Sequence, residues 1–203
     1  LVGGEEGGKP AALTGGFYLM TTGQIEGAEF PGESDLFCTY TFTHGPDWTI
    51  VHGVDTAVSQ ISQRSDAGDT ASFVWNFPLD ITYKTTNAFG WPRLVVTVVA
   101  RDMFHRYVVK GYGAVALPTV PGRYVREVRT FAPAASSKIQ EWAAWITGNY
   151  PQFYDPKFVG RGEGREVTRV RSTGVVRIAF NVMTRGMESH GYSSGGTKDA
   201  PAA

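Results

Sequence analysis

Alternation of apolar and polar side chains is the dominant pattern along this chain. Over residues 36–43, and again over 175–182, every second residue is aliphatic, aromatic or cysteine. Because successive side chains of a β-strand point to opposite faces, this period of two predicts strands with at least one buried face. A third alternating set covers 79–83. The strand over 36–43 is expected to end at His44, because Gly45 and Pro46 follow it.

The apolar run over 94–99 has a different pattern, because it is rich in valine and does not alternate. Such a run predicts a strand that is buried on both faces. Weaker strand candidates, separated by glycine and proline, lie at 17–20, 73–75, 112–117 and 124–131. Together these segments predict an all-β fold, a β-sandwich of about eight strands.

One segment, near residues 137–147, has the periodicity of a helix. Ser137 and Gln140 have the spacing of a capping box, and Gly148 would end the helix. Four apolar residues share one face at the spacing i, i+3, i+4 and i+7: Ile139, Trp142, Ala143 and Ile146. A single short helix is therefore expected beside the strands, and its apolar face is interpreted as core packing.

Composition favours one folded domain between two tails. The chain has 203 residues, of which 42% are hydrophobic, and this is enough for a single core. Residues 1–15 and 193–203 are rich in small residues and are expected to be flexible, which leaves a domain over 16–192. No membrane-spanning run or secretory signal is recognised, and the one cysteine favours a reducing compartment.

The net charge is zero, but the charges are unevenly distributed. Residues 1–80 carry 2 basic and 11 acidic side chains, a net −9, whereas residues 81–186 carry 16 basic and 6 acidic ones, a net +10. The remaining 187–203 carry a net −1. Overall neutrality argues against non-specific nucleic-acid binding, so no nucleic-acid partner is expected. A local basic face remains compatible with a protein partner or an anionic membrane surface.

The most concentrated basic pattern is at 165–171. In an extended chain Arg165, Arg169 and Arg171 would share one face, and guanidinium groups suit carboxylates and phosphates. We interpret these three residues as candidate partner contacts, with a solvated strand face as the simpler alternative.

No catalytic or metal-binding motif is recognised. The four histidines lack HxH or HExxH spacing, and Cys38 lies in an alternating apolar set that favours a buried thiol. The glycines at 160–164 do not match a phosphate-binding loop. The sequence therefore predicts a protein that is not an enzyme and holds no cofactor, although distant residues could still form an unrecognised site.

Four strings, in order, resemble the B9 domain family: GQIEGAEF (23–30), WNFPLDITYKTTNAFGWP (75–92), GYGAVALP (111–118) and GEGREVTRVRSTG (162–174). The resemblance runs from about Gly16 to Tyr192. It implies a C2-like antiparallel β-sandwich. It also implies a non-enzymatic component of the ciliary transition zone, in the tectonic-like (Meckel syndrome) complex that gates ciliary membrane composition and supports ciliogenesis and Hedgehog signalling.

The same resemblance implies partners and a location. The partners would be B9 domain-containing protein 2, the Meckel syndrome type 1 protein and further members of the tectonic-like complex. The location would be the cytoplasm and cytoskeleton at the base of the cilium, in the transition zone and basal body.

The C2-like fold raises the question of calcium, which needs about six to eight oxygen ligands. We place the equivalent loop at 100–106, where Asp102 is the only acidic residue and Arg101, Arg106 and Lys110 lie close in sequence. We therefore expect no calcium. The alternatives for these cations are calcium-independent binding of phosphoinositide headgroups, contact with an acidic partner, or simple solvation.

Two tryptophans receive different interpretations. Trp75 lies between strand candidates and is assigned to the core. Trp145 lies opposite the apolar face of the expected helix, so it is predicted to be exposed and is a candidate interface residue.

Overall fold

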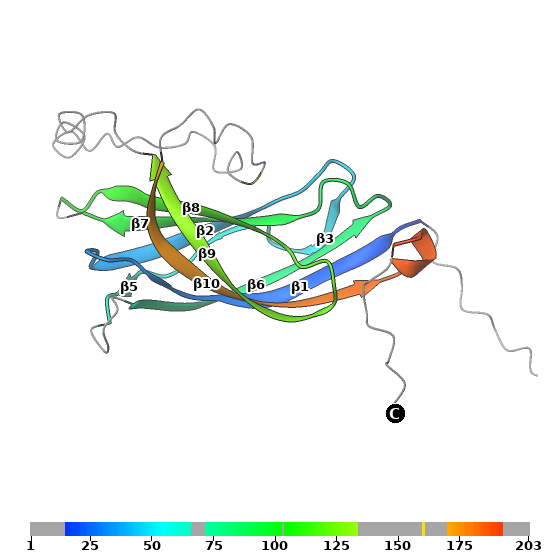
Figure 1. Ribbon diagram of the computed structural model, residues 1–203, viewed down its shortest axis with the longest axis horizontal. Helices are drawn as coiled ribbons and strands as arrows, with labels where there is room; N and C mark the ends of the chain where they lie inside the picture. Colours follow the sequence, from blue (N-terminus) through cyan, green and yellow to red (C-terminus); the bar gives the residue numbers. More distant parts are fainter. Residues whose placement is uncertain (1–14, 66–71, 103, 134–159, 161–169, 193–203) are drawn as a thin grey trace, which may run out of the picture.

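The computed structural model describes residues 15–65, 72–102, 104–133, 160 and 170–192 (Figure 1). In these residues the chain forms ten strands and one short 3-10 helix. The strands are β1 (Phe17–Glu29), β2 (Asp35–Thr43), β3 (Thr49–Gly53), β4 (Thr56–Val58), β5 (Ser62–Gln63), β6 (Ser72–Thr85), β7 (Arg93–Arg101), β8 (Tyr107–Ala116), β9 (Gly122–Pro133) and β10 (Val170–Arg185), and η1 spans Glu188–His190.

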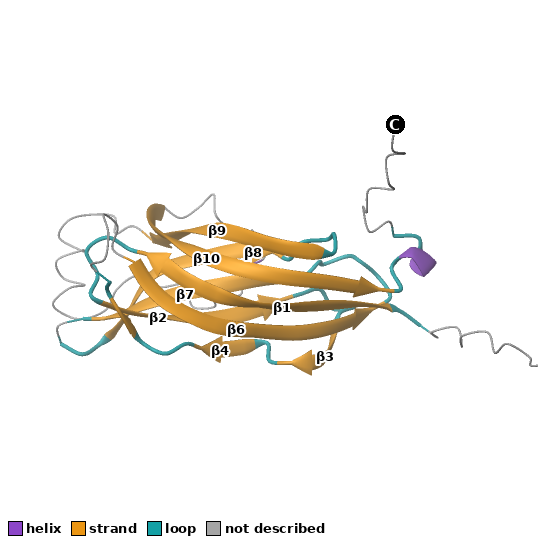
Figure 2. Cartoon of the chain, turned by 90° about the horizontal axis from the view of Figure 1, so that it is seen from below, coloured by secondary structure: helices purple, strands orange, loops and turns teal. Residues whose placement is uncertain are grey.

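The strands form one antiparallel sheet that folds over on itself. Its order is β3-β6-β1-β10-β9-β8-β7-β2-β4, and β5 pairs with β2. One layer contains β3, β6, β1, β10 and β9, whose side-by-side order is visible in Figure 2. The other contains β8, β7, β2 and β4, and lies across the core from the first in Figure 1. The predicted all-β sandwich is confirmed.

The core lies between the layers and is built from the alternating residues. Each long strand contributes aliphatic or aromatic side chains from its inner face; β2, for example, buries Leu36, Cys38, Tyr40 and Phe42. The run in β7 is buried on both faces, as predicted, because Val95 packs against Tyr112 in a second, smaller cluster on the outer side. Trp75 is 3% exposed and donates its indole N–H to the Leu36 carbonyl, which confirms its assignment to the core.

A register shift lies in the middle of β1, between Ile25 and Gly27, on both sides of the strand. Gly27 passes so close to β6 that a Cβ atom there would overlap the Phe73 carbonyl oxygen. This close approach explains why the string at 23–30 has a glycine at position 27, because any side chain there would force the two strands apart.

The strand predictions differ from the structure in two respects. The segments expected at 73–75 and 79–83 are one continuous strand, β6, since the irregularity between Val74 and Phe77 shifts the register with β1 without ending the strand. Three short strands, β3, β4 and β5, were not predicted, because each has five residues or fewer and too few positions to show alternation. The expected helix near 137–147 lies outside the described residues, as do both predicted tails apart from Gly15.

Candidate docking surfaces

The cationic loop predicted from sequence joins β7 to β8, and its geometry depends on Asp102. This carboxylate accepts hydrogen bonds from the backbone N–H groups of Phe104 (2.8 Å) and Arg106 (2.9 Å). The Arg106 guanidinium also pairs with it at 2.8 Å. Although desolvation raises the pKa of Asp102, these hydrogen bonds and the nearby positive charge outweigh it and hold the pKa below its usual value. Asp102 therefore organises the loop.

The other two predicted cations, Arg101 at the end of β7 and Lys110 in β8, pair with carboxylates from a distant part of the sequence. Arg101 lies 3.3 Å from Asp35, at the start of β2, and Lys110 lies 2.9 Å from Glu33, in the turn before it. These partners were missed in the sequence because they are more than 60 residues away, and only the pairing of β2 with β7 brings them close. Arg101, Arg106 and Lys110 each have a carboxylate partner.

This pairing affects the calcium and lipid hypotheses. Glu33, Asp35 and Asp102 each pair with a side-chain cation, with which a calcium ion would have to compete. The expectation of no calcium stays a prediction. Among the described residues no group of three or more histidine, cysteine, aspartate or glutamate side chains has the geometry to hold a metal ion. Phosphoinositide binding stays a prediction, which the ion pairs disfavour because a headgroup would have to displace the carboxylates.

Of the remaining predicted contact residues, only Arg171 is described. It lies near the start of β10 and is exposed. Arg165, Arg169 and Trp145 lie outside the described residues. Their proposed role in docking therefore stays a prediction, as does the exposure of Trp145.

A second group of arginines, on β9, was not recognised in the sequence. Arg123, Arg126 and Arg129 are exposed, and no salt bridge joins them to a carboxylate of the described residues. β9 pairs with β10 along its whole length but with β8 only through Tyr112 and Phe131. The spacing of three residues between successive arginines was visible in the sequence, but it gives no sign that the strand has an open side.

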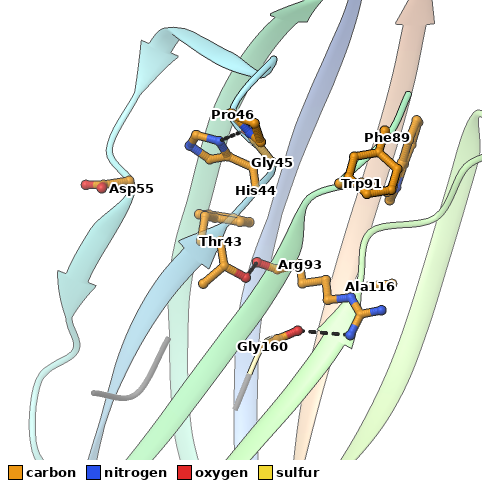
Figure 3. A pocket seen from close by; sticks show the side chains of 12 residues that line it. Thr43, His44, Gly45, Pro46, Asp55, Phe89, Trp91, Arg93, Ala116 and Gly160 are labelled. Atoms are coloured by element: carbon orange, nitrogen blue, oxygen red, sulfur yellow. Dashed lines mark hydrogen bonds between the residues drawn. The ribbon is translucent and has the colours of Figure 1, made fainter. Parts of the chain in front are cut away.

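A cavity of about 700 Å³ lies where β2 ends and β7 begins (Figure 3). His44, Phe89 and Trp91 lie on its walls, and Arg93 donates a hydrogen bond to the Gly160 carbonyl at 2.9 Å. The imidazole Nδ1 of His44 is bonded to the Gly45 carbonyl and not to a hydroxyl. Among the described lining residues there is thus no nucleophile hydrogen-bonded to a base, as nucleophilic catalysis would require.

The single cysteine lies in an environment that makes its thiol unreactive. Cys38 is fully buried in β2, as predicted. Burial raises the pKa of its thiol to about 12, and this outweighs a hydrogen bond with Ser59 that acts in the opposite direction. A neutral, inaccessible thiol is a poor nucleophile. Separately, no helix among the described residues has the length and apolar character needed to cross a membrane.

Fold and surface together define a class: an antiparallel β-sandwich with an aromatic core, whose charged side chains lie on loops and on exposed strand faces. Residues 19–183 match the B9-C2 family, described as "Ciliary basal body-associated, B9 protein". The chain belongs to this B9 family.

Relatives and one solved structure give the extent of the similarity. The chain is 48% identical to B9 domain-containing protein 1 of Xenopus laevis, over 92% of this chain and 93% of that protein, and 48% identical to the Homo sapiens protein, over 88% and 87%. It is 31% identical to B9 domain-containing protein 2 of Bos taurus, over 83% and 94%. A C2 domain of plant extended synaptotagmin 1 superimposes with a TM-score of 0.40 and 8% identity, covering 81% of this chain and 92% of that one.

Proposed function

We propose that this protein is a non-enzymatic structural component of the ciliary transition zone. The observation that carries the proposal is the identity of 48% to B9 domain-containing protein 1 along nearly the whole of both chains. The family description, which places B9 proteins at the ciliary basal body, supports the location at the base of the cilium, in the cytoplasm and cytoskeleton.

In this proposal the protein assembles with B9 domain-containing protein 2, the Meckel syndrome type 1 protein and further members of the tectonic-like complex. The assembly gates the composition of the ciliary membrane, and thereby supports ciliogenesis and Hedgehog signalling. A scaffold role is supported by the exposed arginines of β9 and by the inert environment of Cys38.

Co-expression followed by gel filtration tests the proposal. The full chain, produced together with B9 domain-containing protein 2 and the Meckel syndrome type 1 protein of the same species, should elute with them as one complex. Persistent separate elution at low salt would contradict the scaffold role. In ciliated cells, a fluorescent fusion of the chain should concentrate at the base of the cilium, and a uniform cytosolic signal would contradict the location.

A further inference from the structure

The side of β9 that faces away from β10 is an open strand edge. In an antiparallel strand, alternate residues direct their N–H and C=O groups to opposite sides. β10 takes up one side of β9 from Gly122 to Pro133. On the other side β8 pairs at Phe131 and also lies against Val128 and Thr130 through Gly113. In Figure 2, β9 is the outermost strand of its layer on that side. Between Gly122 and Glu127, no strand of the described residues pairs with this side of β9, so every second backbone unit there is available to a further strand.

The charges on this edge limit what can pair with it. Arg123 and Arg129 project from the outer face of the layer, on the same side as the exposed Val125. Arg126 projects from the opposite face, the one on which Val128 is buried, and is nevertheless exposed. Inward-pointing charges on an edge strand are a known protection against indiscriminate strand pairing. Glu127 is the one acidic side chain over this stretch, so the edge is positive.

A strand that carries carboxylates would overcome this protection. Its backbone would pair with the open N–H and C=O groups, and its carboxylates would meet the guanidinium groups, which suit them in shape and charge. An apolar or basic strand would leave the same arginines desolvated without a partner, at a cost that would reject it. The edge is therefore selective for an acidic strand.

We propose that the open edge of β9 binds, by strand addition, a carboxylate-bearing edge strand of a second B9 domain protein. This inference rests on the proposed function, which supplies the partner, and adds the surface through which the two proteins meet. The three arginines then have two roles: they keep the edge unpaired in the isolated protein, and they select the acidic strand in the complex.

A pair of double variants tests the role of the charges. Arg126→Glu/Arg129→Glu reverses two charges on the edge and removes the contact between the Arg126 guanidinium and the Tyr124 ring, 5.4 Å from its centroid. Lys84→Glu/Arg185→Glu is the matched control, because it makes the same change in charge on the same layer and removes the contact of Lys84 with the Tyr18 ring at 5.7 Å. Affinity for B9 domain-containing protein 2 is measured for the full-length chain by calorimetry.

We expect the β9 variant to bind at least tenfold more weakly than the wild-type protein, and the control to bind within a factor of two or three of it. If the wild-type chain binds and both variants bind equally well, the β9 inference is overturned while the proposed function stands. If the wild-type chain itself does not bind, both are overturned. Unfolding by urea shows whether each variant is folded.

Hydrogen exchange tests the strand addition itself and needs no substitution. In the isolated protein, alternate backbone amides between Gly122 and Glu127 should exchange rapidly. In the complex with B9 domain-containing protein 2 these amides should become protected, at every second residue. Protection that appears on β3 or β8, with β9 unchanged, would overturn the inference.

Discussion

The two ends of the sandwich are held together by different forces. At the end where β2 finishes, Trp48 packs edge-to-face against Phe17, Tyr83 and Trp91, with ring centroids 5.1–5.9 Å apart. At the opposite end, where β7 turns into β8, ion pairs join the β7–β8 region to the β1–β2 turn. Figure 1 shows η1 at the first end and the β7–β8 turn at the other. The aromatic end depends on burial and the ionic end on charge, so different changes should weaken each.

The largest effect is expected at the aromatic end. Trp48 is 2% exposed, and its indole N–H donates to the Phe89 carbonyl at 2.9 Å. Trp48→Ala should lower the free energy of unfolding by about 3–5 kcal/mol, since it leaves a large cavity and an unpaired carbonyl. Urea titration followed by circular dichroism measures this loss. Phe89→Ala is the control, because that ring is 75% exposed and its removal should cost less than about 0.5 kcal/mol.

Alkaline pH should lower the free energy of unfolding, because Cys38 in the core and Tyr83 at the aromatic end are buried groups that can lose a proton. Burial raises the pKa of the Cys38 thiol from 9.0 to about 12, and it raises the pKa of Tyr83, where Asp55 adds to the effect. Below pH 9 the thiol is neutral in both the folded and the unfolded chain. Above it, the unfolded chain loses protons that the folded chain retains, so stability falls as pH rises from about 9 to 12. The thiol alone contributes up to about 1.4 kcal/mol per pH unit.

Unfolding by urea at several pH values between about 8 and 11 measures this dependence. Cys38→Ala should give a shallower fall in stability than the wild-type protein, because the thiol no longer contributes. Equal slopes for the two proteins would show that the thiol is not the group responsible.

The smallest effect is expected at the ionic end, where it should depend on salt. Lys110 and Glu33 are 30% and 22% exposed, so water screens their attraction, and a double-mutant cycle to alanine should give a coupling of about 0.5–1 kcal/mol. Raising the salt concentration to about 1 M should reduce this coupling, because the Debye length falls to about 3 Å. The cost of Trp48→Ala should change little over the same range. A coupling that does not change with salt would contradict an electrostatic origin.

The paired cations of the ionic end also differ from the arginines of β9. Arg101 and Lys110 hold the β7–β8 region against the β1–β2 turn, whereas no salt bridge joins Arg123, Arg126 or Arg129 to the described carboxylates. The first group therefore has an internal structural role. The second is available to a partner, and this contrast is the basis for placing the docking edge on β9.

Much of the strand content could be predicted from the chain because it depends on local periodicity. The alternation in β2, and the valine run of β7, are properties of neighbouring residues, and burial followed them closely. The short strands β3, β4 and β5 could not be predicted, because their pairing with β6 or β2 is decided by distant residues. The candidate site was predicted less well, since cationic residues were identified without their carboxylate partners.

The sequence by itself determined the all-β character, the buried Cys38 and Trp75, and the family, because each follows from side-chain pattern or from long matching strings. Only the tertiary structure decided which charges are paired. Glu33 and Lys110 are brought to 2.9 Å by the pairing of β7 with both β2 and β8, and the divergence of β8 from β9 leaves one strand edge open. Local pattern fixes which way a side chain faces; the order of strands in the sheet fixes what it meets there.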